Sequence, residues 1–224
     1  MKNLVTHHKE LRKNNWLNTE ISYTYNSYGF RSESFDNSSS IEGLLSLGCS
    51  YTEGVGIHNE DTFAYQLSKK LGLCNWNLGQ GGGGSDTCFR LAHHWVPKLK
   101  PKVVIMLTPD LLRTELLWND LQNKSHHKEL ASPFWSFDDS KYNCELYETY
   151  IQTDQNGYYN REKNKLGIKQ IVESTGATFI SLDVNHLFLK FSINDSCARD
   201  LRHPGASKQT IIVNEFYKEY LKTQ

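Results

Sequence analysis

Residues 102–107 read Lys-Val-Val-Ile-Met-Leu, and five of these six side chains are apolar. An apolar run without the alternation of a half-exposed strand is typical of a strand that is buried on both faces of a parallel sheet. The segments at 43–48, 73–78 and 177–182, which also have six residues each, have the length of further strands. We therefore expect four strands, with residues 102–107 inside the sheet.

Segments with helical character separate these strands. Residues 61–71, for example, carry apolar side chains at i, i+4 and i+8. The predicted helices span residues 61–71, 85 to about 95 (capped by Ser85-Asp86 and ended before Pro97), 144–175 (broken near Asn156-Gly157) and 205–221. Strands that alternate with helices predict an α/β fold, here a three-layer α/β/α sandwich with a mainly parallel, flavodoxin-like sheet.

The chain has 224 residues and no Pro- or Ser-rich linker, which favours one domain. Residues 1–40 are polar and loop-like, and we expect them to pack on the domain as an N-terminal extension. The domain itself is expected to span 41–224. Residues 118–142, which are polar and rich in aromatic side chains, are predicted to form an insertion in it.

Charge and composition exclude several classes of protein. Lys and Arg number 25 and so do Asp and Glu, so the chain lacks the positive field that nonspecific nucleic-acid binding requires. The five cysteines are widely spaced without a C-x-x-C, which predicts reduced thiols rather than disulfides or a zinc site. No apolar run has the length of a membrane span or of a signal peptide, so no membrane partner is expected and the expected location is the cytoplasm.

In parallel α/β sheets, ligands bind beyond the carboxyl ends of the strands. After the first strand the chain reads Gly48-Cys49-Ser50-Tyr51-Thr52-Glu53-Gly54. A serine after a strand and a glycine sits on a tight turn with its hydroxyl exposed, and the backbone N–H groups of a following helical turn are placed to stabilise an oxyanion. Taken alone, the same pattern also fits an ordinary turn.

After the second strand comes a cluster of five glycines within residues 79–84. Glycines let a substrate approach backbone N–H donors closely. The cluster lacks both the dinucleotide-binding and the P-loop pattern, with Asp86 and Thr87 standing where a P-loop has Lys and Ser/Thr. An oxyanion hole and a plain flexible turn both remain open at this point.

Near the C-terminus the chain reads Asp200-Leu201-Arg202-His203-Pro204. An Asp three residues before a His can fold back so that its carboxylate meets the imidazole, which fixes the tautomer and stabilises the imidazolium formed when the His takes a proton from a serine. Pro204 is predicted to start the last helix. A surface ion pair is the alternative reading of this spacing.

Taken together and in this order, the three stretches resemble the blocks of the SGNH (GDSL-type) hydrolases. Residues 48–54 are similar to the family's Gly-Asp-Ser block, residues 77–82 to its Asn-x-x-x-x-Gly run, and residues 200–203 to its Asp-x-x-His block. Residues 26–31 (Asn-Ser-Tyr-Gly-Phe-Arg) also resemble a stretch that precedes the serine block in some members, so the resemblance covers about residues 24–220.

The resemblance implies the SGNH hydrolase fold and a role for each matching residue. Ser50 would be the nucleophile, His203 the general base and Asp200 the residue that orients it. The backbone N–H groups of Ser50 and Gly82 would form the oxyanion hole. Neither a metal nor an organic cofactor is implied.

The chain departs from the family's pattern at two positions. Cys49 stands where the first block has Asp, a position that does not carry the nucleophile. Pro109, after the third strand, stands where the third block supplies an oxyanion-holding Asn. Because proline has neither a side-chain amide nor a backbone N–H, one oxyanion donor is missing, which typically costs about 10²–10³ in rate. Thr108 and Arg113 are the nearby candidates to replace it.

These residues predict a serine esterase that hydrolyses acyl esters, with acetyl esters on carbohydrate as one substrate class. The expected partner is a small-molecule or carbohydrate ester, and the oligomeric state is not indicated. Two alternatives remain open. One is a weakly active or inactive binding or structural module of the same fold, which Pro109 favours. The other is an O-acyltransferase that uses the same three side chains.

Three further features have a simple interpretation beside a functional one. Cys49 is a poor candidate nucleophile, because its side chain is expected to point away from that of Ser50. The adjacent histidines are predicted to be solvated surface residues, since two neighbours cannot face one metal site; they are His7-His8, His93-His94 and His126-His127. The aromatic residues of 134–137, with Trp118, fit either a sugar-stacking wall or an insertion that packs on the core.

Overall fold

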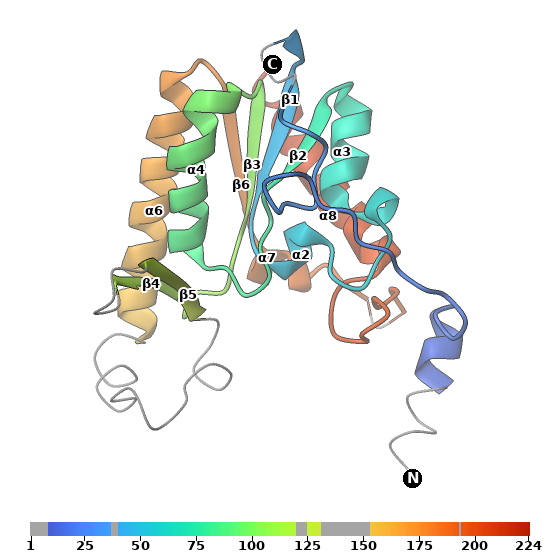
Figure 1. Ribbon diagram of the computed structural model, residues 1–224. Helices are drawn as coiled ribbons and strands as arrows, with labels where there is room; N and C mark the ends of the chain where they lie inside the picture. The colour runs from blue at the N-terminus through green and yellow to red at the C-terminus, as the bar shows by residue number, and fades with distance from the viewer. Residues whose placement is uncertain (1–8, 37–39, 120–124, 131–152, 193) are drawn as a thin grey trace.

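A computed structural model describes residues 9–36, 40–119, 125–130, 153–192 and 194–224 (Figure 1). Four parallel strands form its central sheet, in the order β2 (Cys74–Asn77), β1 (Gly43–Leu47), β3 (Val103–Thr108) and β6 (Thr178–Asp183). Every residue of β1 and β3 is buried. The strand expected inside the sheet is therefore there, hydrogen-bonded to a neighbour on each side.

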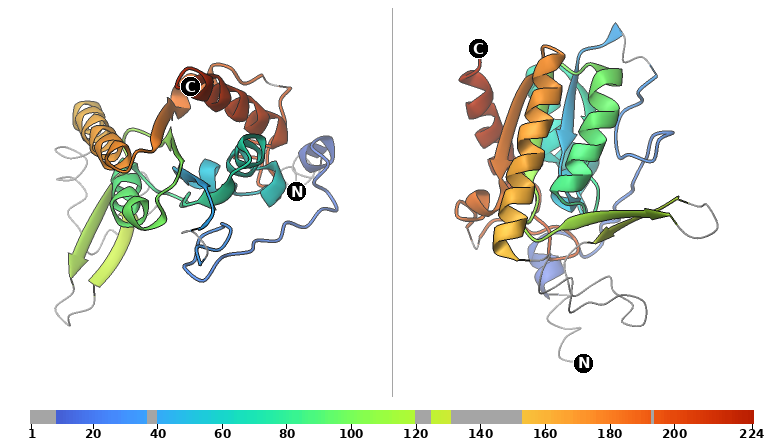
Figure 2. Two further views of the ribbon diagram at one scale, coloured as in Figure 1. Left: turned by 90° about the horizontal axis from the view of Figure 1, so that it is seen from above. Right: turned by 90° about the vertical axis from the view of Figure 1, so that its left-hand side faces the viewer.

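Helices cover both faces of the sheet (Figures 1 and 2). On one face, Leu45 of β1 and Val104 of β3 pack in a core with α4 (Ser85–Leu99) and α6 (Asp154–Ser174). On the other face, Leu44 and Val103 pack in a core with α3 (Phe63–Leu71) and α8 (Ala206–Leu221). Neighbouring residues of one strand thus supply opposite cores, as the alternation of side chains along a strand requires. The three-layer α/β/α prediction is confirmed.

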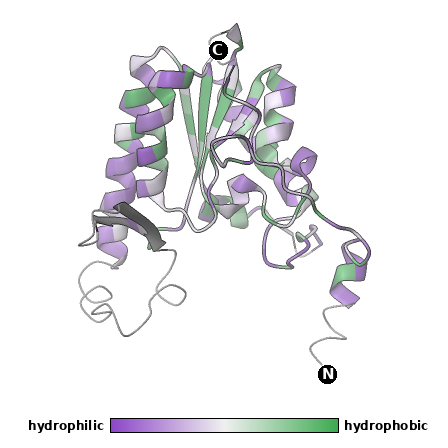
Figure 3. Cartoon of the chain, in the orientation of Figure 1, coloured by the Kyte–Doolittle hydropathy of each residue, from purple (hydrophilic) through white to green (hydrophobic). Residues whose placement is uncertain are grey.

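Hydropathy follows these layers. In Figure 3 the strands are mostly hydrophobic, whereas α4 and α6 carry many hydrophilic residues. α3 has its polar residues on one side, and its buried side chains include Phe63 and Leu67. Burial of such amphipathic faces supplies most of the stability of helices in proteins.

Two predicted helix boundaries are wrong. α4 does not end before Pro97 but runs through it to Leu99, because buried Val96 and Leu99 hold the last turn against the core. Its N-cap is Gly84 rather than Ser85 or Asp86. Proline near a helix end removes only one backbone hydrogen bond there, and packing outweighs that loss.

The predicted break at Asn156-Gly157 is also wrong, because α6 passes through it from Asp154 to Ser174. The helix begins just before this pair, at Asp154, and its N-cap is Thr153, whose side chain accepts a hydrogen bond from the Asn156 N–H. Gly157 serves a close approach, since a Cβ atom there would lie 2.5 Å from the carbonyl oxygen of Leu111. Residues 144–152 of the predicted helix lie outside the described residues.

The segment after β3 forms an antiparallel hairpin of β4 (Thr114–Asn119) and β5 (Ser125–Leu130). It overlaps the first part of the predicted insertion, and residues 131–142 lie outside the described part of the chain. Residues 9–13 form a helical turn, so the N-terminal segment is not entirely loop as predicted. Short helices α2 (Ser50–Glu53) and α7 (Val184–Phe188) follow β1 and β6 at the carboxyl edge of the sheet.

Candidate active site

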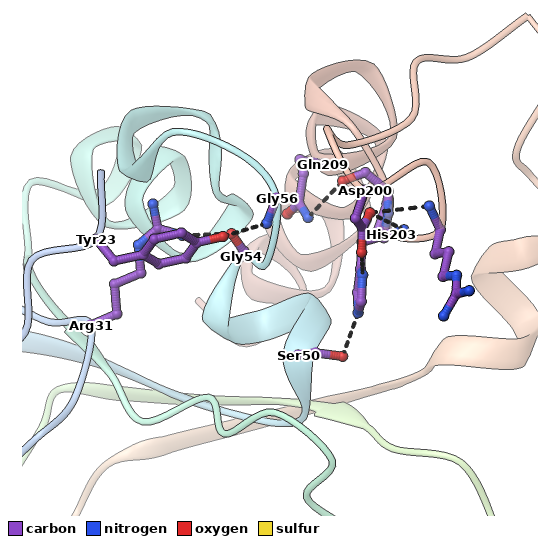
Figure 4. Close-up of polar contacts among 10 residues, drawn as sticks. Tyr23, Arg31, Ser50, Gly54, Gly56, Asp200, His203 and Gln209 are labelled. Carbon is purple, nitrogen blue, oxygen red and sulfur yellow. Dashed lines mark hydrogen bonds and ion pairs between the residues drawn. The ribbon is translucent and has the colours of Figure 1, made fainter. Parts of the chain in front are cut away.

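Ser50 is the first residue of α2 and follows β1 through a turn that only glycine allows. Gly48 has φ 154°, and a Cβ atom there would lie 2.1 Å from the Thr52 hydroxyl and 2.9 Å from the Leu107 carbonyl oxygen. Cys49 then caps the helix with extended backbone angles. The sharp turn brings Ser50 out of the strand, with its side chain directed toward the C-terminal part of the chain (Figure 4).

His203 and Asp200 meet Ser50 from 150 residues further along the chain. The Nε2 atom of His203 is 2.8 Å from the Ser50 Oγ. The Nδ1 atom of His203 contacts the Oδ2 atom of Asp200, and Figure 4 shows the three side chains in a row. The structure thus brings together the three residues that the sequence predicted as a catalytic group, in the order that proton transfer from a serine requires.

The Asp200 carboxylate is built to stay ionised. Burial by itself would raise its pKa, but hydrogen bonds from the backbone N–H and ring of His203 and from the backbone N–H of Arg202 hold the pKa below its usual value. The fold-back of the D-x-x-H turn therefore provides both the contact with the imidazole and a charge to orient it. Pro204 does not start the last helix as predicted, since α8 begins at Ala206 with Gly205 as its N-cap.

Tyr51 and Gln209 also contact the site, and sequence reasoning assigned neither of them a role. The Tyr51 ring packs edge-on against the His203 ring, at 5.4 Å between centroids. Gln209, buried in α8, accepts a hydrogen bond from the Phe63 N–H and donates to the carbonyl oxygens of Tyr51 and Pro204. The sequence signal for this bridge is weak: Gln209 is a polar residue within a helix that also carries apolar side chains.

The loop after β2 lies against the serine turn. Asn77 donates from its amide to the Thr52 carbonyl oxygen at 2.7 Å, and the Gln80 N–H donates to the Gly48 carbonyl oxygen at 3.1 Å. Gly82 has φ 79°, in the left-handed region that favours glycine. Within the part of the chain that the structure describes, the N–H groups of Ser50 and Gly82 donate to no acceptor. They are the two donors expected at an oxyanion hole.

The turn after β3 lacks a matching donor. Thr108 is buried at the end of β3, and Pro109 follows it directly. Arg113 comes next to the glycine loop, since a Cβ atom on Gly84 would lie 2.5 Å from its carbonyl oxygen. One of its guanidinium nitrogens, Nη1, is buried without a hydrogen-bond partner among the described residues.

The charge of Arg113 affects the pKa of Tyr51 within the site. The pKa of the Tyr51 phenol is raised, chiefly because the phenol is buried, and Arg113 acts against this rise. Arg113 therefore places a positive charge near the residue that follows Ser50. Arg113 and Thr108 were the two residues considered as replacements for the missing Asn. Arg113 has a guanidinium nitrogen with no acceptor among the described residues, whereas Thr108 is the last residue of a buried strand.

The other candidate residues fall elsewhere. Cys49 is 3% exposed, while the imidazole lies on the neighbouring Ser50. His94 lies on α4, 2.7 Å from the Lys98 amine. The pair His126-His127 lies in β5, while His7-His8 and the aromatic residues of 134–137 are outside the described residues.

Two searches of the described residues found nothing. No group of three or more His, Cys, Asp or Glu side chains in the described ranges has the arrangement of a metal site. In the same ranges, no helix is both long enough and apolar enough to cross a membrane.

Comparisons with known proteins reveal similarity in structure. No family model matches the sequence, and no curated protein matches it. The crystal structure of TesA is 13% identical and has a TM-score of 0.50, over 79% of this chain and 97% of that chain. The esterase EstA from Pseudoalteromonas sp. is 15% identical with a TM-score of 0.41, over 81% and 99% of the two chains.

A family 3 carbohydrate esterase from Clostridium thermocellum is 16% identical, with a TM-score of 0.40 over 82% of this chain and 98% of that one. At such identities a structural likeness establishes the fold and not the reaction. The likeness to TesA agrees with the parallel sheet and its two helical layers. The chain therefore has the fold of the SGNH (GDSL-type) hydrolases, as the resemblance of its sequence blocks implied.

Proposed function

We propose that the protein is a serine esterase that hydrolyses acyl esters through Ser50, His203 and Asp200. The observation that carries this proposal is the continuous contact from the Ser50 hydroxyl through both ring nitrogens of His203 to the Asp200 carboxylate. A surface ion pair has no reason to place its histidine on a serine at a helix N-terminus. The SGNH hydrolase fold supports the same conclusion.

The hydrogen-bond arrangement assigns the protons. The Asp200 carboxylate accepts from the N–H at Nδ1 of His203, so Nε2 is the nitrogen left to accept the proton of the Ser50 hydroxyl. As Oγ attacks the ester carbonyl carbon, that proton moves to Nε2, and the imidazolium is stabilised by Asp200. The same proton then passes to the leaving alcohol as the tetrahedral intermediate collapses to an acyl-serine.

Hydrolysis of the acyl-serine repeats these steps with water. His203 takes a proton from the water, the hydroxide attacks the acyl carbon, and Ser50 leaves with the proton returned from the imidazolium. In both halves the negative oxygen is held by the N–H groups of Ser50 and Gly82. Backbone N–H groups beside a helix N-terminus are of the type that stabilises an oxyanion.

Ester hydrolysis by wild type and Ser50→Ala tests the proposal, with p-nitrophenyl acetate as substrate. We expect Ser50→Ala to lose at least about 10⁴-fold in kcat/KM, because both the nucleophile and the acyl intermediate are lost. A fluorophosphonate is expected to label wild type at Ser50, identified by peptide mass spectrometry. The matched control is Cys49→Ala, which should keep its label; loss of the label there and not in Ser50→Ala would assign the nucleophile to Cys49.

An ester panel defines the substrate. Acetyl esters on simple and on carbohydrate alcohols are the first class to test, followed by esters of increasing acyl length. Because the same acyl-serine can react with a sugar hydroxyl, products are analysed with and without an acceptor. Transfer that exceeds hydrolysis would identify an O-acyltransferase.

Pro109 favours a second candidate function, a binding module that keeps the fold without the reaction. It removes a donor from the third turn of the site. Equal hydrolysis rates for wild type and Ser50→Ala, together with an unlabelled Ser50, would favour this second function.

A further inference from the structure

Arg31 is a fully buried cation that holds backbone rather than an anion. It is 2% exposed, and its guanidinium donates to the carbonyl oxygens of Gly54 at 2.5 Å and of Ile57 at 2.8 Å. Burial lowers its pKa from the usual value. Because burying a charge is costly, an arginine in this position implies that the chain segment it holds has to stay in place.

Tyr23 holds the same segment from the next position. The Cζ atom of Arg31 lies over the Tyr23 ring, 4.3 Å from the ring centroid. The Tyr23 hydroxyl accepts a hydrogen bond from the Gly56 N–H at 2.7 Å. Gly54 and Gly56 have φ 81° and 79°, so two residues of the segment that follows α2 adopt the left-handed conformation. We call Tyr23 and Arg31 the clamp and residues 54–57 the clamped turn.

The clamped turn supports residues 198–203, which we call the Asp200 loop. The Arg199 N–H donates to the Gly56 carbonyl oxygen at 2.8 Å. A Cβ atom on Gly56 would lie 2.9 Å from the Ala198 Cβ and 3.3 Å from Asp200 Oδ1, so the turn and the loop are in close contact. Figure 4 shows Gly54 and Gly56 between the clamp on one side and Asp200 with His203 on the other.

The Asp200 loop needs this support because its own backbone is strained. Leu201 has φ 59°, a left-handed conformation that is unfavourable for a residue with a side chain. Such a conformation persists only where surrounding contacts hold it. The N-terminal segment supplies further contacts: the Trp16 indole donates to the Cys197 carbonyl oxygen at 2.7 Å, and Asn14 Oδ1 accepts from the Cys197 N–H at 2.9 Å.

We propose that Tyr23 and Arg31 are positioning residues for the esterase reaction, which hold Asp200 in hydrogen-bonding register with His203 through the clamped turn. This inference rests on the proposed function. It gives a role to the stretch at residues 26–31, which ends in Arg31. Tyr23 and Arg31 of the N-terminal segment then contribute to catalysis by positioning Asp200, although neither side chain touches Ser50 or His203.

The experiment compares Tyr23→Phe with Tyr25→Phe. Tyr23→Phe removes the acceptor of the Gly56 N–H but keeps the ring under Arg31, so the variant retains the packing of the clamp. Tyr25 is the matched control, because its ring stacks on Tyr23 and its hydroxyl donates to half-buried Glu53 instead of to the clamped turn. Rates are expressed per active site titrated with a fluorophosphonate, which removes any difference in the folded fraction.

We expect Tyr23→Phe to lower kcat about 10-fold with KM nearly unchanged, and Tyr25→Phe to leave both unchanged. Arg31→Gln should lower kcat by about 10²-fold and Arg31→Lys by less, because an ammonium can still donate to a carbonyl oxygen. A residue that only stabilises the fold would lower the melting temperature without this separation of kcat from KM.

A proton NMR signal gives a readout that needs no ester. The proton between His203 Nδ1 and Asp200 should resonate far downfield in wild type and Tyr25→Phe, and should be shifted or lost in Tyr23→Phe. Equal signals and equal kcat in the two tyrosine variants would overturn the inference. If instead Ser50→Ala keeps wild-type activity, the esterase proposal fails, while the NMR comparison still tests whether the clamp positions Asp200.

Discussion

The two sides of the candidate site are built to different degrees of completeness. On the proton-transfer side, Ser50, His203 and Asp200 each have a hydrogen-bond partner in the protein itself. On the side of the turn after β3, Pro109 offers no donor, and Arg113 has a buried nitrogen without an acceptor in the part of the chain that the structure describes. In the proposed esterase reaction, the groups that activate the serine are therefore already in contact, whereas few groups would stabilise the oxyanion. The following predictions test this contrast.

The largest expected effect lies on the proton-transfer side. Asp200→Asn should lower kcat by about 10⁴-fold, because an amide donor facing Nδ1 favours the tautomer whose Nε2 cannot accept the serine proton. Steady-state kinetics on p-nitrophenyl acetate measures the loss. Asp36→Asn, at an exposed carboxylate that accepts a hydrogen bond from Ser34, is the control and should leave kcat unchanged. A loss of less than about 10-fold for Asp200→Asn would show that His203 does not depend on the carboxylate.

Pro109→Asn sharpens the contrast from the other side. Asparagine restores both a backbone N–H and a side-chain amide at the turn, so we expect kcat to rise by about 10-fold or more. Pro109→Ala restores only the N–H and separates the two contributions. An unchanged kcat in both variants would mean that the oxyanion already has all the donors it uses.

Arg113 is expected to contribute a smaller amount. Arg113→Met keeps much of the side chain's length and removes its charge, and we expect kcat to fall by about 10-fold because a positive group near the oxyanion is lost. Arg113→Lys should retain part of the rate. If Arg113→Met lowers the rate only for esters that carry a carboxylate, and does so through KM, the guanidinium binds that substituent and not the oxyanion.

The smallest effect is on stability at acid pH. The pKa of Asp200 is lower in the folded chain than its usual value, so between the two values the unfolded state binds more protons and stability rises with pH. The contribution is present above about pH 4 and is lost as the pH falls through the folded value. Urea unfolding at several pH values from about 3 to 6 measures it. Asp200→Asn should flatten this part of the profile, and an unchanged slope would contradict the assigned direction.

Several elements were predictable because their signals are local. The apolar run at 102–107 predicted β3, since only a strand with neighbours on both sides and helices on both faces buries five successive apolar side chains. The D-x-x-H spacing places Asp200 within one turn of His203, so their proximity could be predicted from neighbouring residues. The contact between His203 and Ser50 was implied by the resemblance of the sequence blocks to those of the SGNH hydrolases.

Other elements depended on partners that lie far away in the sequence. Pro97 and Gly157 were expected to end or break helices, because intrinsic propensity disfavours them there. Packing of Val96 and Leu99 on the core continues α4 past Pro97, and the approach of Leu111 explains Gly157. Propensity is a weak signal where a buried face supplies more free energy than one lost hydrogen bond.

Local sequence patterns were enough to predict the four strands of the central sheet, the helices that cover it and the residue types at the strand ends, because hydrophobic periodicity and turn chemistry are properties of neighbouring residues. Packing of distant segments, by contrast, brings Tyr23 and Arg31 to the turn behind Asp200, and places Arg113 beside the glycine loop with a nitrogen that has no acceptor among the described residues. Such contacts join segments that are distant along the chain, and their hydrogen-bond geometry is set when those segments pack together rather than by any local pattern.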